Sequence, residues 1–407
     1  MREFFQVADV EEARAQALGF ASVGSGRVPL EGALGRVLAA DVVAAADLPG
    51  FSRSTMDGFA VRASSTFGAS DGAPALLAVV GSVEMGRSAE VVVGPGEAAG
   101  IPTGGMLPKG ADAVVMVEHT EPVDESTVEV MRSVAPGANV IGAADDARAG
   151  DTALERGTRL RPPEVGLLAA LGVTEVEVFD RPRVAILSTG DEVVPAEETP
   201  GPGRVRDVNR HSLGAFVESC GGVALPRGIV PDEFDALLEA CRAACDLADV
   251  VLISGGSSVG ARDLTIEVLE ALPESRVLLH GVAMRPGKPT ILADVAGRPV
   301  WGLPGHVASA MVVFSVLVRP QIEHLGGATR RRSVLVPATL TRNLASAHGR
   351  REFVRVRLRE RDGTLRAEPV PGRSGLVRTM VGADGLIEIG RDVEGLFEGS
   401  VVRVELF

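Results

Sequence analysis

Two cationic side chains, Arg285 and Lys288, stand on a bend built from Pro286, Gly287 and Pro289. Proline fixes the backbone φ angle, so such a bend aims two charges at a ligand with little further loss of conformational entropy. The pattern predicts a clamp for a small oxyanion. A solvated basic loop, the usual fate of a neighbouring Arg and Lys, is the alternative that the residues alone leave open.

Three carboxylates, Glu192, Asp232 and Asp263, stand near the ends of apolar runs that are typical of strands. Mg²⁺ prefers one or two carboxylates together with substrate oxygens, so acids at one sheet edge predict a metal site beside a phosphate. Each acid alone also fits a surface charge or a helix cap, since Asp232 directly precedes a predicted helix and Asp263 falls near or within one. Their common placement at the strand ends favours the metal site.

Turns rich in small and polar residues follow two of these runs. The first, 188–192, contains Gly190 and Asp191. The second, 254–260, precedes a predicted helix, whose N-terminal N–H groups attract phosphate. Its candidate phosphate contacts are Gly255, Gly256, Ser257 and Ser258. A glycine turn alone is weak evidence, and because the P-loop and dinucleotide fingerprints are missing, the common nucleotide folds are disfavoured.

The segment that carries these turns alternates strand and helix. Strands are predicted at 184–187, 223–230, 250–253 and 290–293, and helices at 209–218, 233–244, 263–271 and 308–324. This alternation predicts a mostly parallel sheet with helices on both faces. Ligands bind beyond the carboxyl ends of such strands, where a further turn with Pro304 opens the helix that carries Ser309.

The rest of the chain predicts three further domains. Helical periodicity at 8–20 and 28–46 predicts a small helical N-terminal unit, to which a helix at 162–171 and a strand at 174–179 return. Short Val-rich runs at 75–80, 90–93, 113–118 and 127–134 predict an inserted antiparallel β domain, and alternation at 352–358 and 401–407 predicts a C-terminal β domain. The predicted domains are 1–46 with 147–180, 47–146, 181–326 and 327–407.

Composition excludes several classes of partner. The net charge of −13 and the aromatic content of 3% argue against nucleic acid, which needs clustered Lys and Arg or stacking rings. The longest apolar stretch, 307–318, is too short for a membrane span, and the start has no basic-then-apolar signal, so we expect a cytoplasmic protein. Cys220, Cys241 and Cys245 lack metal-binding spacing and are expected to be reduced and partly buried.

Several segments are informative as an ordered set. Ser54-Thr55-Met56-Asp57-Gly58 and Thr103-Gly104 stand ahead of a Gly-Ala-Asp-Ala-Val run at 110–114. The turn at 188–192, Asp207-Val208-Asn209, the Ser-Gly-Gly loop and the Pro-Gly-Lys-Pro bend then follow. In composition and order these segments resemble the blocks of the molybdopterin molybdenumtransferase family, which includes the gephyrin E-domain. The resemblance covers essentially the whole chain.

This resemblance implies a transferase that inserts molybdenum from molybdate into adenylated molybdopterin, with Mg²⁺ present, and releases AMP. It implies an α/β multidomain chain with a central, mostly parallel α/β domain, an inserted β-rich domain, a small helical N-terminal domain and a C-terminal β-barrel. It further implies a homodimer whose cleft joins the α/β domain of one subunit to the inserted domain of the other. The protein partners it points to are the molybdopterin adenylyltransferase and apo-molybdoenzymes.

The resemblance also assigns roles to residues. The adenylate and metal side comprises Glu192, Asp232, Ser258 and Asp263, and the three carboxylates are the implied metal ligands. Molybdate and the pterin phosphate are assigned to Arg285, Lys288, Ser309, Arg350 and Ser374. The implied cofactor-binding set also contains Thr103, Gly190, Asp191, Gly255, Gly256, Ser257 and Pro304. Asp57 and Asp146 join the catalytic carboxylates from the inserted domain across the dimer.

Two departures from the family pattern and three alternatives stay open. The family commonly has Asn-Pro where this chain has His306-Val307, which loosens the helix start, and Arg285 stands where Lys is frequent. The alternatives are a tungstate-preferring variant, a non-catalytic binding or scaffolding homologue, and a generic phospho-sugar or nucleotide transferase. The retained acidic positions argue against the second alternative, and the Met56-Asp57-Gly58 segment is unexplained by the third.

Overall fold

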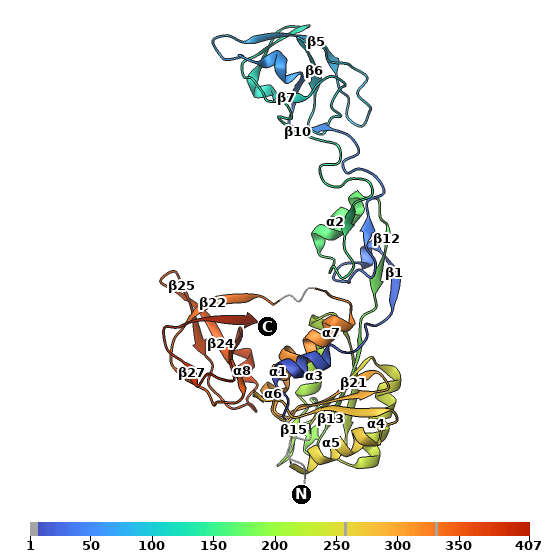
Figure 1. Cartoon of the computed structure of the whole chain (residues 1–407), viewed down its shortest axis with the longest axis vertical. Helices are drawn as coiled ribbons and strands as arrows, with labels where there is room; N and C mark the ends of the chain where they lie inside the picture. The colour runs from blue at the N-terminus through green and yellow to red at the C-terminus, as the bar shows by residue number, and fades with distance from the viewer. Residues whose placement is uncertain (1–6, 256–258, 330–332) are drawn as a thin grey trace. The chain divides into compact units, whose positions relative to one another are not determined.

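The computed structural model describes residues 7–255, 259–329 and 333–407 (Figure 1). The chain divides into two compact units. The first unit comprises Met1–Ala39, Gly157–Arg161 and Val176–Phe407, and the second comprises Ala40–Arg156 and Pro162–Glu175. The finer division into four domains stays a prediction.

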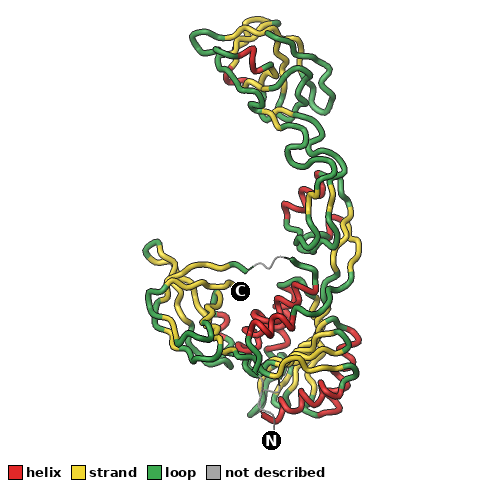
Figure 2. The backbone as a smooth tube through the Cα atoms, viewed as in Figure 1, coloured by secondary structure: helices red, strands yellow, loops and turns green. Residues whose placement is uncertain are grey.

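A six-stranded mixed sheet forms the centre of the first unit (Figure 2). Its order is β16 (Val223–Val230), β13 (Arg183–Thr189), β17 (Val250–Ser254), β21 (Arg298–Leu303), β20 (Ile291–Val295) and β18 (Ser275–His280). Neighbours from β16 to β21 are parallel, as predicted, whereas β20 is antiparallel to both β21 and β18. The β20–β21 hairpin turns through Ala296 and Gly297, which both have positive φ, at 49° and 80°.

Both faces of this sheet are buried, because alternate residues of each central strand point to opposite sides. Ile186 packs with Leu213 of α3 (Asn209–Ser219), whereas Leu187 packs with Leu237 of α4 (Phe234–Leu247). The first face is also covered by α1 (Val10–Ala17), α6 (Val307–Val313), a π-helical segment (Phe314–Val318) and α7 (Arg319–Leu325), and the second by α5 (Val259–Ala271). The predicted α/β layering is confirmed.

The C-terminal region closes into a five-stranded barrel. Its strands, in spatial order, are β24 (Arg351–Arg361), β25 (Thr364–Pro369), β22 (Leu335–Leu340), β28 (Val401–Leu406) and β26 (Gly385–Ile389), and the pairing of β26 with β24 closes the ring. The expected β-barrel is therefore confirmed. A short strand, β19 (Met284–Arg285), pairs in parallel with β24, so Arg285 lies opposite Glu352 at the barrel wall.

The second unit contains another six-stranded sheet. Its order is β7 (Ala113–Met116), β4 (Gly58–Val61), β6 (Glu97–Ile101), β5 (Ala75–Ser82), β9 (Thr127–Val130) and β8 (Thr120–Asp124). The β-rich prediction is confirmed, but the purely antiparallel arrangement is wrong, because β5 and β6 pair in parallel. The strand expected at 90–93 is reduced to an isolated bridge between Val92 and Lys109.

The small helical N-terminal domain is only partly correct. Helix α1 forms, and its cap Asp9 accepts a hydrogen bond from the Glu11 N–H at 3.0 Å. Residues 28–46 do not form the expected α-helix, because Gly35 adopts a left-handed φ of 78° that interrupts the apparent periodicity. The elements observed nearby are β1 (Ser25–Pro29), a 3₁₀ turn (Leu30–Gly32), β2 (Val42–Val43), β11 (Thr152–Leu154), α2 (Pro162–Ala170) and β12 (Glu175–Phe179).

The remaining elements are short. They are β3 (Arg53–Ser54), β10 (Val140–Ile141), β14 (Val193–Val194), β15 (Val205–Arg206), β23 (Leu344–Ala345), α8 (Arg378–Val381), β27 (Gly395–Leu396) and the 3₁₀ turns Ala63–Thr66 and Val117–His119. Among them, β3 pairs with β10, β14 with β15 and β23 with β27. These pairs fix loops that carry several of the predicted site residues.

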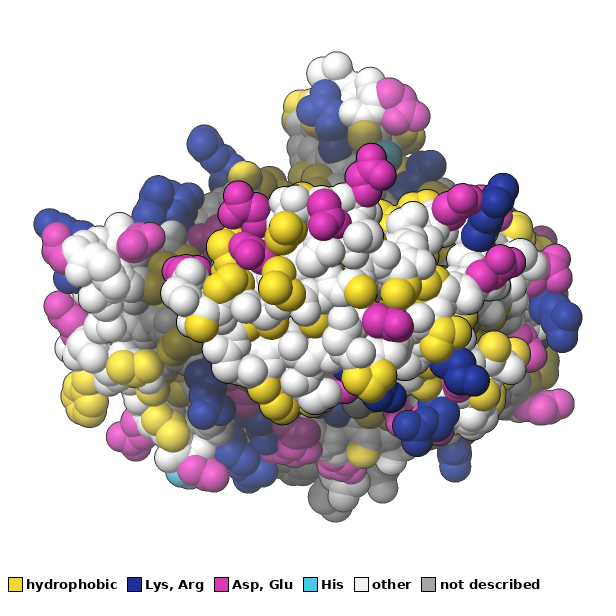
Figure 3. All heavy atoms as spheres, turned by 90° about the horizontal axis from the view of Figure 1, so that it is seen from above, with side chains coloured by type: hydrophobic (Ala, Val, Ile, Leu, Met, Phe, Trp, Pro, Cys, Tyr) yellow, Lys and Arg dark blue, Asp and Glu magenta, His cyan; other side chains and the backbone are white. Residues whose placement is uncertain are grey.

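Surface and interior agree with the composition. Figure 3 shows, on the face seen from above, acidic side chains spread among basic and apolar ones. Within the described ranges, no helix has the length and apolar character that crossing a membrane requires. All three cysteines are free and buried, as expected, and burial raises the pKa of the Cys220 and Cys241 thiols to about 12.

Candidate functional site

A cavity of about 900 Å³ in the first unit brings together the residues predicted to hold an oxyanion. Its lining includes all five of them, namely Arg285, Lys288, Ser309, Arg350 and Ser374. These residues come from β19 and the bend after it, from α6, from the segment ahead of β24 and from the loop ahead of α8. Chain segments that are distant in sequence therefore converge on one pocket.

The bend that carries the two cations is held by its own backbone. The Lys288 carbonyl accepts a hydrogen bond from the Val282 N–H at 2.9 Å, and the buried Thr290 hydroxyl donates to the Gly287 carbonyl at 2.6 Å. Gly287 has a φ of 118°, and a Cβ on it would lie 2.4 Å from a methyl carbon of Val313 in α6. Only glycine fits there, so the bend is packed tightly against the helix.

The start of α6 forms a second wall of the cavity. His306 is the N-cap residue, and its Nδ1 lies 3.0 Å from the Ser374 hydroxyl. The Ala308 N–H donates to the Ser374 carbonyl at 2.9 Å, so one of the N–H groups that a helix start leaves unpaired is satisfied by this loop. Ser309 is buried one residue further on. The helix thus begins normally although the family's second proline is replaced by Val307.

Charge in the cavity is mostly positive. Arg285 lies 3.5 Å from Glu352, the acidic residue of the lining, and Glu352 also accepts from the Ser346 hydroxyl at 3.2 Å. Arg350 has a buried Nε without a protein partner among the described residues. Arg355 donates to the Gly372 carbonyl at 2.9 Å, and burial lowers the pKa of its guanidinium. A pocket with these donors suits a small dianion.

Sequence reasoning missed three basic residues of this lining. They are His306, Arg355 and Arg373, which stand beside the predicted five. Arg355 lies within a strand whose alternating pattern indicates only a barrel wall, and Arg373 lies in an irregular loop, so neither had a local sequence signal for ligand binding. For His306 a signal existed, since it departs from the family pattern directly before the predicted helix.

The carboxyl ends of the parallel strands carry a second group of polar residues. The Thr189 hydroxyl donates to Asp232, and the Asp232 N–H donates to the Asp191 carboxylate at 3.3 Å. Asn209 donates to the Ser254 hydroxyl at 2.7 Å and to the Gly305 carbonyl at 2.9 Å. The predicted turn after β13, the loop before α4 and the turn after β21 therefore meet at one sheet edge.

Unsatisfied oxygens mark the same edge. The buried side-chain oxygens Ser188 Oγ, Asp207 Oδ2 and Asn209 Oδ1 have no hydrogen-bond partner among the described residues. A buried oxygen without a partner is costly, so such a set indicates a place for a donor, a cation or water. Asp207 and Asn209 stood in a family block but were not predicted as site residues, since burial is not visible in the sequence. Gly255 completes the edge, because a Cβ there would lie 2.0 Å from the Thr189 carbonyl oxygen.

Part of the predicted adenylate and metal site is not described. Gly256, Ser257 and Ser258 lie outside the described residues, as does the side chain of Asp263. Glu192 is exposed in the turn after β13. Within the described ranges, no three His, Cys, Asp or Glu side chains gather as a metal site would require. The carboxylate trio therefore stays a prediction.

The second unit holds the remaining predicted residues. The Thr103 N–H donates to the Asp57 carboxylate at 2.7 Å, and the Gly104 N–H donates to the Ser54 carbonyl at 2.8 Å. These bonds join the Ser-Thr-Met-Asp-Gly and Thr-Gly segments into one exposed turn structure. Asp146 is exposed in the segment that follows β10. A contribution of these acids to the cleft of another subunit stays a prediction.

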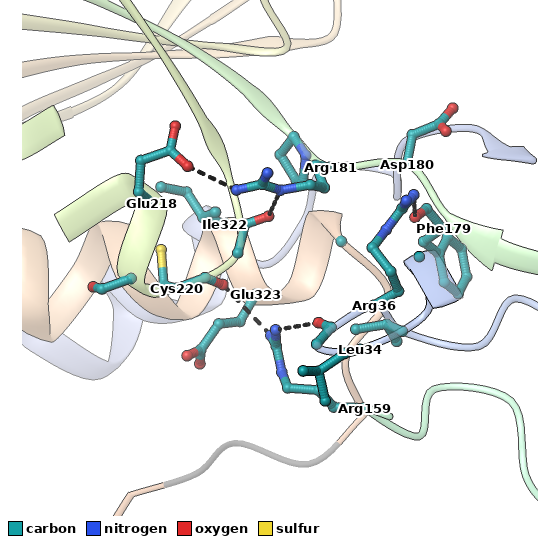
Figure 4. A pocket seen from close by; sticks show the side chains of 17 residues that line it. Leu34, Arg36, Arg159, Phe179, Asp180, Arg181, Glu218, Cys220, Ile322 and Glu323 are labelled. Carbon is teal, nitrogen blue, oxygen red and sulfur yellow. Dashed lines mark hydrogen bonds and ion pairs between the residues drawn. The ribbon is translucent and has the colours of Figure 1, made fainter. Parts of the chain in front are cut away.

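A further cavity of about 480 Å³ in the first unit is explained by the fold (Figure 4). Arg159 donates to the Cys220 carbonyl at 3.4 Å, and Arg181 donates to the Gly222 carbonyl at 2.5 Å and to Glu218 at 2.7 Å. A helix leaves carbonyl groups unpaired at its C-terminus, and basic side chains satisfy them. These arginines therefore cap α3.

Three family models match the chain in order. The MoeA N-terminal region (domain I and II) matches residues 8–172, a probable molybdopterin binding domain matches 185–324, and the MoeA C-terminal region (domain IV) matches 337–407. The second match contains the sheet with its polar edge, and the third contains the barrel.

Relatives and solved structures agree with these models. Molybdopterin molybdenumtransferase 2 of Mycobacterium tuberculosis is 36% identical over 93% of this chain and 94% of its own length, and the Bacillus subtilis molybdopterin molybdenumtransferase is 34% identical over 93% and 89%. The molybdopterin biosynthesis MoeA protein of Pyrococcus horikoshii OT3 superposes with a TM-score of 0.85 at 31% identity, covering 99% of this chain and 100% of that one. Since the matches extend over nearly the whole chain, it belongs to the molybdopterin molybdenumtransferase (MoeA) family.

Proposed function

We propose that this chain inserts molybdenum from molybdate into adenylated molybdopterin and releases AMP. The observation that carries the proposal is the cationic cavity, in which Arg285, Lys288 and Arg350 stand beside the hydroxyls of Ser309 and Ser374. The chain as a whole is acidic, with a net charge of −13, so a local gathering of cations is unexpected unless an anion binds there. Molybdate is a small tetrahedral dianion of suitable charge.

The chemistry asks the protein mainly for charge stabilisation and positioning. A molybdate oxygen attacks the pterin phosphorus and the P–O bond to AMP breaks. The two sulfurs of the dithiolene then bind molybdenum, and the Mo–O bond to the oxygen that stays on phosphorus breaks. Arg285, Lys288 and Arg350 neutralise charge on molybdate and on the phosphate that it attacks. No side-chain nucleophile is needed, which agrees with three buried cysteines whose thiol pKa values are all raised by burial.

Mg²⁺ is proposed to bind at the polar edge of the sheet. The Asp191 carboxylate accepts from the Asp232 N–H at this edge, and the buried Asp207 Oδ2 has no partner among the described residues. Carboxylate oxygens, the ligands that a hard cation prefers, are therefore available there. We assign Asp232, with Glu192 and Asp263, to hold the ion. When bound, Mg²⁺ would neutralise charge on the phosphoanhydride. The residues of the Ser-Gly-Gly loop would hold the adenylate end. Gly190, Thr103 and Pro304 would also contact the adenylated molybdopterin.

The proposed assembly is a cytoplasmic homodimer in which Asp57 and Asp146 of one subunit complete the cleft of the other. It predicts that two variants rescue each other at a molybdate concentration far below the half-saturation of Lys288→Ala, where each alone has little activity. Asp57→Asn keeps an intact first unit, and Lys288→Ala keeps an intact second unit. A statistical mixture should then recover about a quarter of the wild-type activity, because half of the dimers carry one intact site of two. Sedimentation of the same samples checks the dimer. No recovery in the mixture would contradict the shared cleft.

The direct test is incubation of the purified chain with adenylated molybdopterin, molybdate and Mg²⁺, with AMP release followed over time. We expect release that depends on molybdate. Binding of adenylated molybdopterin without AMP release would favour a non-catalytic scaffolding homologue, which the named relatives do not favour. Parallel assays with tungstate decide which oxyanion the clamp prefers, since Arg285 supplies a planar fork in place of a point charge. Contacts with the adenylyltransferase and apo-molybdoenzymes remain further proposed partnerships.

A further inference from the structure

We infer that His306 is the proton acceptor for the dithiolene sulfurs when molybdenum is inserted, and that Ser374 positions its ring. This inference rests on the proposed function and goes beyond it, because the oxyanion clamp supplies charge but no group that takes up protons. It also gives a role to the residue at which this chain departs from the Asn-Pro pattern common in the family.

The reaction as proposed must dispose of two protons. Two S–H bonds break and two Mo–S bonds form. One molybdate oxygen stays on phosphorus, and AMP leaves with the electron pair of the broken P–O bond. The Mo–O bond to the oxygen that stays on phosphorus breaks. When the other three oxygens stay on molybdenum as oxo groups, charge and atoms balance with both sulfur protons passed to an acceptor and then to solvent. An acceptor beside molybdate therefore speeds the step in which the sulfurs bind the metal.

The cavity offers one suitable acceptor among its described lining residues. The charged groups that line it with His306 are Arg285 and Lys288 on the bend, Arg350, Glu352 and Arg355 at β24, and Arg373 in the loop ahead of α8. Arginine and lysine side chains are hydrogen-bond donors and are poor proton acceptors in proteins. Both Glu352 oxygens are occupied, one by Arg285 and the other by Ser346. Histidine is the residue type whose charge ordinarily changes between about pH 5 and 8.

The ring of His306 is held as a proton acceptor requires. Nδ1 lies 3.0 Å from the Ser374 hydroxyl, and within the described ranges Nε2 has no protein partner. The Ser374 backbone is fixed in turn by the Ala308 N–H at 2.9 Å. In the tautomer in which Nδ1 carries the hydrogen and donates to the Ser374 hydroxyl oxygen, Nε2 is the unprotonated nitrogen and can accept a proton from a ligand. An oriented base backed by a third group is a recurrent catalytic arrangement.

The test compares the wild-type chain with His306→Asn, the family's residue, and with His306→Ala. AMP release is measured in single turnovers from pH 5 to pH 9, with molybdate varied at each pH. The wild-type rate should rise with pH and then level off, as a rate that depends on a general base does. His306→Asn should lose this rise and be slower on the plateau, on the order of 10²-fold, while half-saturation by molybdate changes much less. His348→Asn, the same change at an exposed histidine outside the cavity, is the matched control.

Two further measurements separate proton transfer from a structural role. Added imidazole should restore much of the rate of His306→Ala, since the cavity of about 900 Å³ has room for it. Ser374→Ala should keep the pH-dependent rise with a smaller plateau. A wild-type pH profile in His306→Asn, or no rescue by imidazole in a folded His306→Ala, overturns the inference alone. No AMP release by the wild-type chain at any pH overturns the proposed function and this inference with it.

Discussion

Replacing Lys288 by alanine removes one charge from the proposed clamp and leaves its backbone in place. The Lys288 carbonyl, not its side chain, bonds to Val282, and the glycine that packs on α6 is untouched. The substitution should therefore change ligand affinity rather than folding. Adenylated molybdopterin should still bind, since its adenylate end is assigned to the separate sheet edge.

The size of the effect follows from the exposure of the side chain. Lys288 is exposed, so water screens its attraction for a dianion. The interaction energy is therefore much smaller than that of two charges in a dry protein interior. A charge-assisted hydrogen bond contributes about 1.5–3 kcal/mol, so half-saturation by molybdate should rise roughly ten- to a hundredfold. Sulfate, a tetrahedral dianion of similar shape, should compete with molybdate and should compete less in the variant.

The assay titrates molybdate against AMP release for the wild-type chain and for Lys288→Ala. Lys109→Ala is a matched control, because Lys109 is the other lysine of the chain, is exposed, and belongs to the second unit. The control should leave half-saturation unchanged. If Lys288→Ala also leaves it unchanged while sulfate competes normally, the clamp lies elsewhere and the Arg/Lys pair is a solvated loop.

Three further predictions follow. Asp232→Asn should raise the Mg²⁺ concentration needed for AMP release and leave molybdate half-saturation nearly unchanged, which a Mg²⁺ titration checks. The backbone hydrogen bond from Glu11, together with the nearby Arg351 and Arg391, lowers the pKa of Asp9. Ionised Asp9 therefore stabilises the folded chain above the unfolded-state pKa, and this stabilisation is lost as pH falls through the folded-state pKa. As pH falls, the free energy of unfolding of Asp9→Asn should therefore decrease less than that of the wild-type chain, which acid unfolding measures. Cys220 and Cys241 should resist thiol reagents at pH 8 until the chain is unfolded, because burial raises their pKa values to about 12.

Periodicity and turn chemistry were enough to predict the sheet that positions the site. The runs at 223–230 and 250–253 became strands with nearly those bounds, because apolar runs of that length between helices have few other solutions. The hairpin of β20 and β21 was not predicted, since its turn through Ala296 and Gly297 lacks the usual Asn-Gly or Asp-Gly signal. The helix expected at 28–46 failed because apolar spacing does not reveal a left-handed glycine.

The oxyanion residues could be identified from the sequence only through a family resemblance. Ser374 meets His306 across 68 positions, and nothing local in either segment indicates that contact. Arg355 lies on a strand whose alternation of polar and apolar residues is explained by the barrel wall alone, so the sequence gives no sign of a binding role. The burial of Asp207 and the loss of a partner for its Oδ2 depend on packing by other segments, so they emerge only in three dimensions.

The geometry of the cavity is fixed largely by main-chain contacts. Arg285 belongs by sequence to the α/β segment, yet its strand pairs with β24, so backbone hydrogen bonds set its position opposite Glu352. On the other wall, the Ser374 carbonyl caps the first turn of α6 through Ala308. Both walls are thus aligned by main-chain contacts between the barrel and the α/β layers. The position of residue 306 is therefore set mainly by main-chain contacts, and an imidazole held there would add acid–base chemistry to the proposed reaction.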